Sequence, residues 1–108
     1  MTEKDYTDSQ ERLARFAKAL AHPARVAIVL FLARRQACYF GDIYDELPIA
    51  KATVSQHLRE LKEAGLIQGE TEPPKVKYCI NRANWLLARQ LFDDFFGQTA
   101  NSDQDCCC

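Results

Sequence analysis

The segment from Ala50 to Gly65 carries the side chains whose types and spacing are most informative about chemistry. Val54, Leu58 and Leu61 recur at i, i+4 and i+7, which is the spacing of one apolar helical face. A second face combines short hydrogen-bonding groups with cationic ones: Ser55, Gln56, His57, Arg59, Lys62. Such a face can present polar tips to base edges and cations to phosphates when the helix lies in a major groove. The alternative is an amphipathic surface helix whose charged face is simply solvated.

The sequence also holds five cysteines, and three of them are its last residues, Cys106, Cys107 and Cys108. The polar start MTEKDYTDSQE is not a secretory signal, and an odd number of cysteines argues against a disulfide framework. We therefore expect reduced thiols that are available for metal, metalloid or redox chemistry. Cys38 and Cys79 are expected to be small core residues instead.

The elements before this segment read as two helices. Ser9 is the expected N-cap of the first, whose apolar residues Leu13, Phe16 and Leu20 follow helical spacing. His22 is the expected N-cap of the second, with Pro23 at its first position. That second helix, extending to about residue 35, is apolar nearly all round and is expected in the middle of the fold.

Around the central segment the pattern predicts a winged helix-turn-helix, mostly α with a small β-hairpin. Residues 42–47 are the expected first helix of the motif, and Gly65 is the expected left-handed residue after the second. Two β-prone runs, 66–69 and 76–80, are joined by a polar, proline-bearing loop over residues 70–75. Lys75 and Lys77 on this hairpin are candidate contacts to phosphates or the minor groove.

Asn81 is the expected N-cap of a last helix that extends to about Phe96. This helix has more large apolar residues than one core face can bury, which predicts a homodimer through the first and last helices. The expected organisation is a flexible N-terminus (1–8), one DNA-binding and dimerisation domain (9–96) and a flexible tail (97–108) that ends in the cysteine triplet.

The net charge of −1 argues against a generic basic nucleic-acid binder, but its distribution is uneven. Residues 51–82 hold six Lys or Arg and four Asp or Glu, whereas residues 83–108 hold one and four. The positive block coincides with the candidate reading helix and hairpin. No apolar run reaches the about 18–20 residues of a membrane span, so a cytoplasmic protein is expected. No phosphate-binding glycine loop or nucleophile–base pattern indicates an enzyme.

These motifs together resemble the ArsR/SmtB family of metalloregulatory repressors. The resemblance covers residues 13–96 and lies in the helix start HPAR (22–25) and the runs ATVSQHL (52–58) and LKEAGLI (61–67). It implies a dimeric winged helix that binds a palindromic operator and leaves DNA when an inducer binds. It also implies the positions that read bases and backbone: Thr53, Ser55, Gln56, His57, Arg59.

Three departures from the family pattern affect the sensor and the reading helix. The family's arsenic motif resembles CxC-D, but the corresponding stretch here, residues 38–42, keeps one thiol. The last helix offers Asp93 and Asp94 but no histidine for the family's zinc or cobalt site. Ala50 also stands where the family has a serine-like cap, and an N-cap without an acceptor costs about 1 kcal/mol.

The terminal cysteines are therefore the candidate sensor. Three thiolates match the pyramidal, three-coordinate preference of As(III) or Sb(III), whereas Zn(II) favours four donors, and soft thiolates also admit Cu(I) or Hg(II). We expect a repressor that leaves its operator when As(III) or Sb(III) binds Cys106, Cys107 and Cys108. The alternatives are a thiol-based redox or sulfide-responsive repressor, a sensor of another soft ion, and a winged helix that does not bind DNA.

Overall fold

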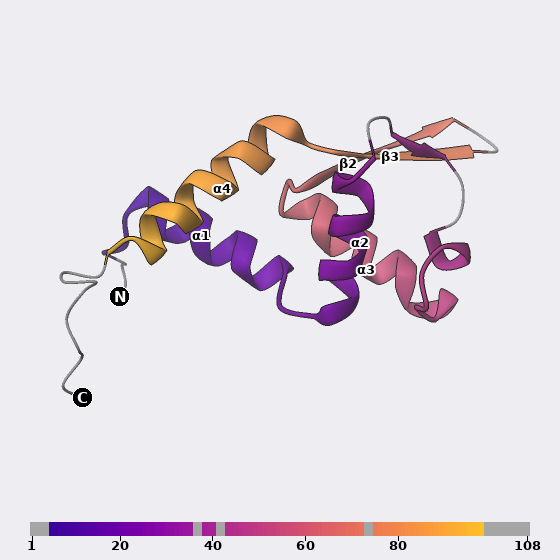
Figure 1. The fold of residues 1–108 in the computed structure, drawn as a ribbon, viewed down its shortest axis with the longest axis horizontal. Coiled ribbons are helices and arrows are strands. Elements are labelled where there is room, and N and C mark those ends of the chain that lie inside the picture. Colours follow the sequence, from indigo (N-terminus) through magenta and orange to yellow (C-terminus); the bar gives the residue numbers. More distant parts are fainter. Residues whose placement is uncertain (1–4, 36–37, 41–42, 73–74, 99–108) are drawn as a thin grey trace.

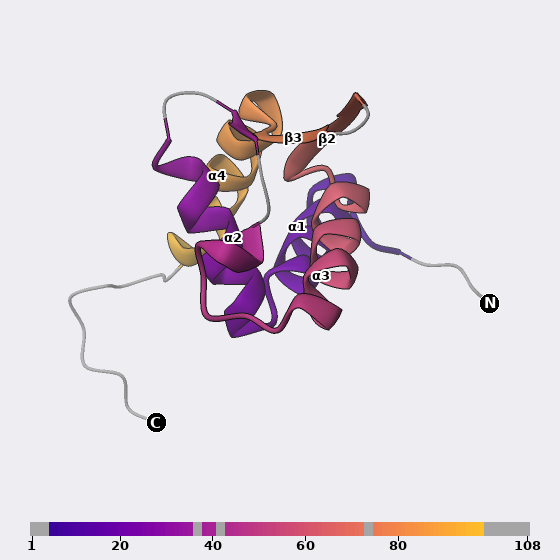
Figure 2. The ribbon, with the colours of Figure 1, turned by 90° about the vertical axis from the view of Figure 1, so that its right-hand side faces the viewer.

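The fold is that of a computed structural model, which describes residues 5–35, 38–40, 43–72 and 75–98. Its elements in chain order are α1 (Asp8–Ala19), α2 (Pro23–Ala33), β1 (Tyr39–Phe40), η1 (Ile43–Asp45), α3 (Lys51–Glu63), β2 (Ile67–Glu72), β3 (Lys75–Ile80) and α4 (Arg82–Phe96). The predicted winged helix-turn-helix, mostly α with a small hairpin, is confirmed. Figures 1 and 2 show the sheet along one edge of the molecule, with α2 and α3 beneath it.

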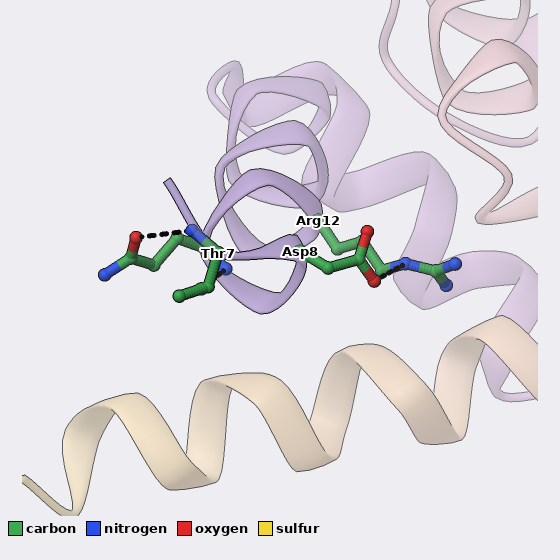
Figure 3. Close-up of polar contacts among 4 residues, drawn as sticks. Thr7, Asp8 and Arg12 are labelled. Atoms are coloured by element: carbon green, nitrogen blue, oxygen red, sulfur yellow. Dashed lines mark hydrogen bonds and ion pairs between the residues drawn. The ribbon is translucent and has the colours of Figure 1, made fainter. Parts of the chain in front are cut away.

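The first helix begins two residues earlier than predicted. Thr7, not Ser9, is the N-cap: its hydroxyl accepts a hydrogen bond from the Gln10 backbone N–H at 3.0 Å, and the Gln10 side chain accepts one from the Thr7 N–H. Arg12 also donates to Asp8 at 3.1 Å across one turn (Figure 3). The reciprocal cap requires Gln or Glu three residues after the N-cap, and Ser9 has Arg12 there instead.

Three other predicted helix boundaries, at His22, Gly65 and Asn81, are confirmed. His22 Nδ1 accepts from the Ala24 N–H at 3.0 Å, and Asn81 Oδ1 accepts from the Asn84 N–H at 3.1 Å. Gly65 follows α3 with φ +89°, a conformation that favours glycine. The Asn84 side chain donates to the Gly65 carbonyl at 2.9 Å, so the end of α3 is fastened to the first turn of α4.

The predicted helix over residues 42–47 is wrong in length. Only one 3₁₀ turn forms, over Ile43–Asp45, and Asp42 lies outside the described residues. Pro48 follows closely and disfavours helical backbone in the residue before it, which leaves no room for a longer helix. Ile43 is nevertheless buried, so this short turn still anchors the chain ahead of α3.

The sheet has three strands in the order β1-β3-β2, and both pairings are antiparallel. The predicted six-residue loop is wrong, because β2 continues to Glu72 and β3 begins at Lys75. In this extension the register pairs Glu70 with Lys77 and Glu72 with Lys75. The ladder therefore extends into the stretch that the sequence pattern assigned to the loop.

The core lies between α2, α3 and the sheet, and it continues between α1 and α4, which pack side by side (Figure 1). Its fully buried members are Ile28, Ile43, Leu61, Leu66 and Ile67. The second helix is less enclosed than predicted, because Val26 and Leu30 are each 40% exposed. Within the described ranges no single helix is long and apolar enough to cross a membrane. Helices α1 and α2 reach that length and hydropathy only as a pair, with a 99° bend between them.

Candidate nucleic-acid interface

Helix α3 separates its buried and exposed faces as its sequence predicts. Val54, Leu58 and Leu61 are buried in the core. Five of the predicted contact residues are exposed on the remaining surface of the helix: Thr53, Ser55, Gln56, Arg59, Lys62. The core therefore fixes α3 by one side and leaves the polar side open to a partner.

Three side chains on α3 form a chain of hydrogen bonds. Arg59 donates to the Gln56 side-chain oxygen at 3.4 Å, and Gln56 donates to the Glu60 carboxylate at 3.0 Å. The amide and guanidinium groups are thus held together in the free protein, at the positions where base and phosphate contacts were predicted. Glu60 was absent from the predicted site, although its spacing of i+4 from Gln56 was a visible signal.

The start of α3 lacks a side-chain cap, as predicted from Ala50. The Thr53 hydroxyl does not substitute, because it donates to the Ala50 carbonyl at 2.9 Å instead of accepting from an N–H. Backbone N–H groups at a helix start attract anions, and no capping side chain competes for them here. Thr53 is thus placed at the end of the helix where a phosphate would be favoured.

His57 is a correction to the predicted interface. It is only 7% exposed, its ring centroid lies 4.5 Å from that of His22, and its Nδ1 accepts a hydrogen bond from Arg25 Nε at 3.1 Å. With this burial, His57 does not belong to the exposed polar surface of α3. Its i+3 spacing from Val54 places it on the apolar face, which was the available signal. His57 instead joins α3 to the start of α2.

Burial, followed by the neighbouring His22 and Arg25, lowers the pKa of His57 below its ordinary 6.5. The unfolded chain then binds a proton at a pH where the folded chain does not, so stability is full above about pH 6.5 and falls as the pH decreases below it. We expect the urea concentration at the unfolding midpoint to decrease as the pH is lowered from 7.5 to 5.5. This decrease should be smaller in His57→Gln, a variant that retains an acceptor for Arg25. An equal decrease in both proteins would contradict the assignment of the pH dependence to His57.

The two predicted hairpin lysines lie on one strand of the hairpin. Lys75 and Lys77 both belong to β3, where the register sets each opposite a glutamate. The ammonium of Lys62, on α3, lies 3.7 Å from the position that a Cβ atom would occupy on Gly69 of β2. Lys62 therefore brings a cation to the junction of α3 and the hairpin.

The cysteines differ from the prediction where they are described. Cys38 and Cys79 form a disulfide with a Cα–Cα distance of 4.5 Å and are not two separate thiols. The predicted ligands Cys106, Cys107 and Cys108 lie outside the described residues. Among the residues that are described, no group of three or more His, Cys, Asp or Glu side chains is placed to hold a metal ion.

Comparison with known proteins agrees with this architecture. A family described as a helix-turn-helix domain matches residues 20–70. The transcriptional repressor SmtB of Mycobacterium tuberculosis is 44% identical over 76 residues, which cover 70% of this chain and 54% of SmtB. The chain thus spans about half the length of that relative. The transcriptional regulator CmtR of the same organism is 35% identical over 82 residues, which cover 76% of this chain and 67% of CmtR.

Solved structures show the same fold. The NMR structure of the cadmium metal-sensor CmtR from Mycobacterium tuberculosis has a TM-score of 0.54 at 32% identity and covers 89% of this chain and 97% of that one. A homodimeric winged helix-turn-helix DNA-binding domain from Mycobacterium bovis has a TM-score of 0.63 at 22% identity, with coverage of 98% and 99%. These relatives are regulators and not enzymes, in line with the sequence.

Proposed function

Because this chain belongs to the ArsR/SmtB family of helix-turn-helix transcriptional regulators, we propose that it is a homodimeric repressor of a palindromic operator. The observation that carries the proposal is the exposed polar face of α3, fixed from behind by its buried apolar face. In this proposal Gln56 and Ser55 meet base edges, while Arg59 and Lys62 meet phosphates. Lys75 and Lys77 take a secondary part at the hairpin.

The proposed dimer rests on the apolar surface of α4. Leu86, Phe95 and Phe96 are 62%, 55% and 70% exposed, and Ala88 is the helix's one buried residue. Phe96 stacks on Phe92 and meets Phe95 edge to face, so the end of the helix carries an aromatic cluster. A surface of this kind favours a partner. A second copy, paired through α1 and α4, would place two α3 helices about 34 Å apart, one duplex turn.

Arg59→Ala tests the DNA contact. We expect operator affinity to weaken by about 1–3 kcal/mol, and the salt dependence of binding to decrease by roughly one phosphate contact. Fluorescence anisotropy of labelled upstream DNA at several salt concentrations measures both. Arg34→Ala, which removes an exposed cation at the end of α2, is the matched control and should leave both unchanged. Equal losses in the two variants would rule out a specific role for Arg59.

The proposed inducer is trivalent arsenic or antimony, bound by Cys106, Cys107 and Cys108. Three thiolates fit the coordination of these ions, and the part of the chain that the structure describes offers no alternative group of three donors. The tail follows directly after α4, whose end carries the proposed dimer surface. Ligand binding there would favour a dimer geometry in which the two α3 helices no longer fit the grooves. Reversing the population from 1:99 to 99:1 requires a differential affinity of about 5.5 kcal/mol.

Cys107→Ser tests the inducer site. It should bind the operator as the natural protein does but should no longer leave it when As(III) is added in thiol-free buffer. Ser102→Ala, a change in the same tail that keeps all three thiols, should respond normally. As(III), Sb(III), Cd(II), Zn(II) and peroxide are titrated in parallel on the anisotropy complex. Normal release of Cys107→Ser by As(III) would remove the tail from the mechanism, and release by peroxide alone would favour the redox alternative.

A further inference from the structure

The bond between Cys38 and Cys79 joins two parts of the fold that are remote in sequence. Cys38 immediately precedes β1, and Cys79 lies on β3, where it continues the pairing of Tyr39 with Tyr78 by one position. Both cysteines are partly buried and neither is sealed in the core. Their Cα–Cα distance of 4.5 Å lies within the usual range for a protein disulfide.

A cavity of about 290 Å³ lies against this bond. Its lining residues are Leu32, Arg35, Cys38, Gln68, Cys79, Ile80 and Arg82. Among these described lining residues two are arginines and none is acidic, so they make the space beside the sulfur atoms cationic. Arg35 is held in place, because its guanidinium carbon lies 5.2 Å from the Phe31 ring centroid and 4.8 Å from that of Tyr39. Guanidinium groups favour carboxylates and attract an approaching thiolate.

We propose that this cavity is a thiol–disulfide exchange site for small anionic thiols that carry a carboxylate. One thiolate attacks a sulfur of the Cys38–Cys79 bond; a mixed disulfide forms, and the other cysteine leaves as a thiolate and takes up a proton. A second small thiolate attacks the mixed disulfide and displaces the remaining cysteine. Two small thiols are oxidised to their disulfide, and the protein gains two electrons and two protons. Arg35 and Arg82 select thiols by charge.

Opening the bond would loosen the approach to the reading helix. β1 has only two residues and pairs only with β3, and two-residue pairings are weak on their own. Its other described attachments all involve Tyr39: the hydroxyl donates to Glu46 at 3.2 Å, and the ring meets Phe31 edge to face and lies 4.8 Å from the Arg35 guanidinium carbon. The chain continues from β1 through η1 to α3. The oxidised protein thus ties the chain ahead of α3 to the hairpin, and we expect reduction to weaken operator binding several-fold.

The test uses the full chain with the tail thiols removed (Cys106→Ser, Cys107→Ser, Cys108→Ser), so that only this pair can react. Reduction is followed by mass spectrometry with three thiols of similar size: 3-mercaptopropionate (anionic), 2-mercaptoethanol (neutral) and cysteamine (cationic). After correction for the thiolate fraction, we expect the anionic thiol to reduce the bond about five- to tenfold faster than the cationic one. We expect salt to reduce this preference. The preference should disappear in Arg35→Gln/Arg82→Gln and persist in Arg35→Lys/Arg82→Lys.

An unchanged preference for the anionic thiol in the glutamine variant would overturn the proposed site. The proposal also fails if the disulfide of the small thiol cannot re-form the Cys38–Cys79 bond in the reduced protein. The lysine variant keeps the test decisive if the glutamine variant fails to fold, since it should still prefer the anionic thiol. Operator binding of the oxidised and reduced tail variant is then compared. Because the As(III) response depends on the tail, loss of that response leaves this inference intact.

Discussion

Replacing Phe95 and Phe96 together by glutamate is expected to give a monomer that has lost most of its affinity for the operator. Both rings are more than half exposed, so the free subunit loses little packing. In a dimer, two glutamates from each subunit would bring four negative charges into an apolar contact. Each carboxylate would lose its hydration there without gaining a positive charge beside it. A monomer engages one half-site, and loss of the second typically lowers affinity by about 10²- to 10⁴-fold. Analytical ultracentrifugation and anisotropy on one sample measure both effects.

The matched control is Phe95→Leu/Phe96→Leu, which keeps the surface apolar and should remain a dimer with near-normal operator affinity. The unfolding midpoint of each variant must be measured, since a misfolded protein also fails to bind. A dimeric glutamate variant would show that another surface joins the subunits; the exposed residues Val26 and Leu30 on α2 would be the next candidates. A monomer that binds the full operator normally would contradict the two-half-site arrangement.

Much of the architecture could be predicted because local signals agree with the tertiary fold. The apolar residues of α3 recur at the spacing of one helical face, and the structure buries that face. His22, Gly65 and Asn81 mark helix boundaries through backbone chemistry that depends on a few neighbouring residues. These features need no knowledge of distant contacts, which is why the sequence predicts them well.

The errors occur where distant residues decide. His57 lies among polar neighbours in sequence, yet Arg25 and His22, more than thirty residues earlier, surround its ring. The hairpin continues into a polar stretch through backbone pairing between its two strands, which no local apolar pattern indicates. Cys38 and Cys79 are 41 residues apart, and only the pairing of β1 with β3 brings them together. An odd cysteine count argues against a full disulfide framework, but it does not exclude a single bond.

Reduction of the Cys38–Cys79 bond is expected to lower the free energy of unfolding substantially. The bond closes a loop with a sequence separation of 41, which contains β1, η1, α3, β2 and most of β3. Constraining the unfolded chain over a loop of this length contributes about 3–4 kcal/mol in the chain-entropy account. For a domain of this size that corresponds to a fall of roughly 10–20 °C in Tm. Urea unfolding of the oxidised and reduced protein measures the difference.

The urea dependence separates this mechanism from a loss of native contacts. If the bond acts on the unfolded state, reduction lets the unfolded chain expand, so the m-value should rise while the free energy of unfolding falls. Cys38→Ser/Cys79→Ser should resemble the reduced protein under both oxidising and reducing conditions. Cys106→Ser/Cys107→Ser/Cys108→Ser should resemble the natural protein, because it keeps the bond. If reduction changes the free energy of unfolding by less than about 1 kcal/mol, the bond does not constrain the unfolded chain as the loop length requires.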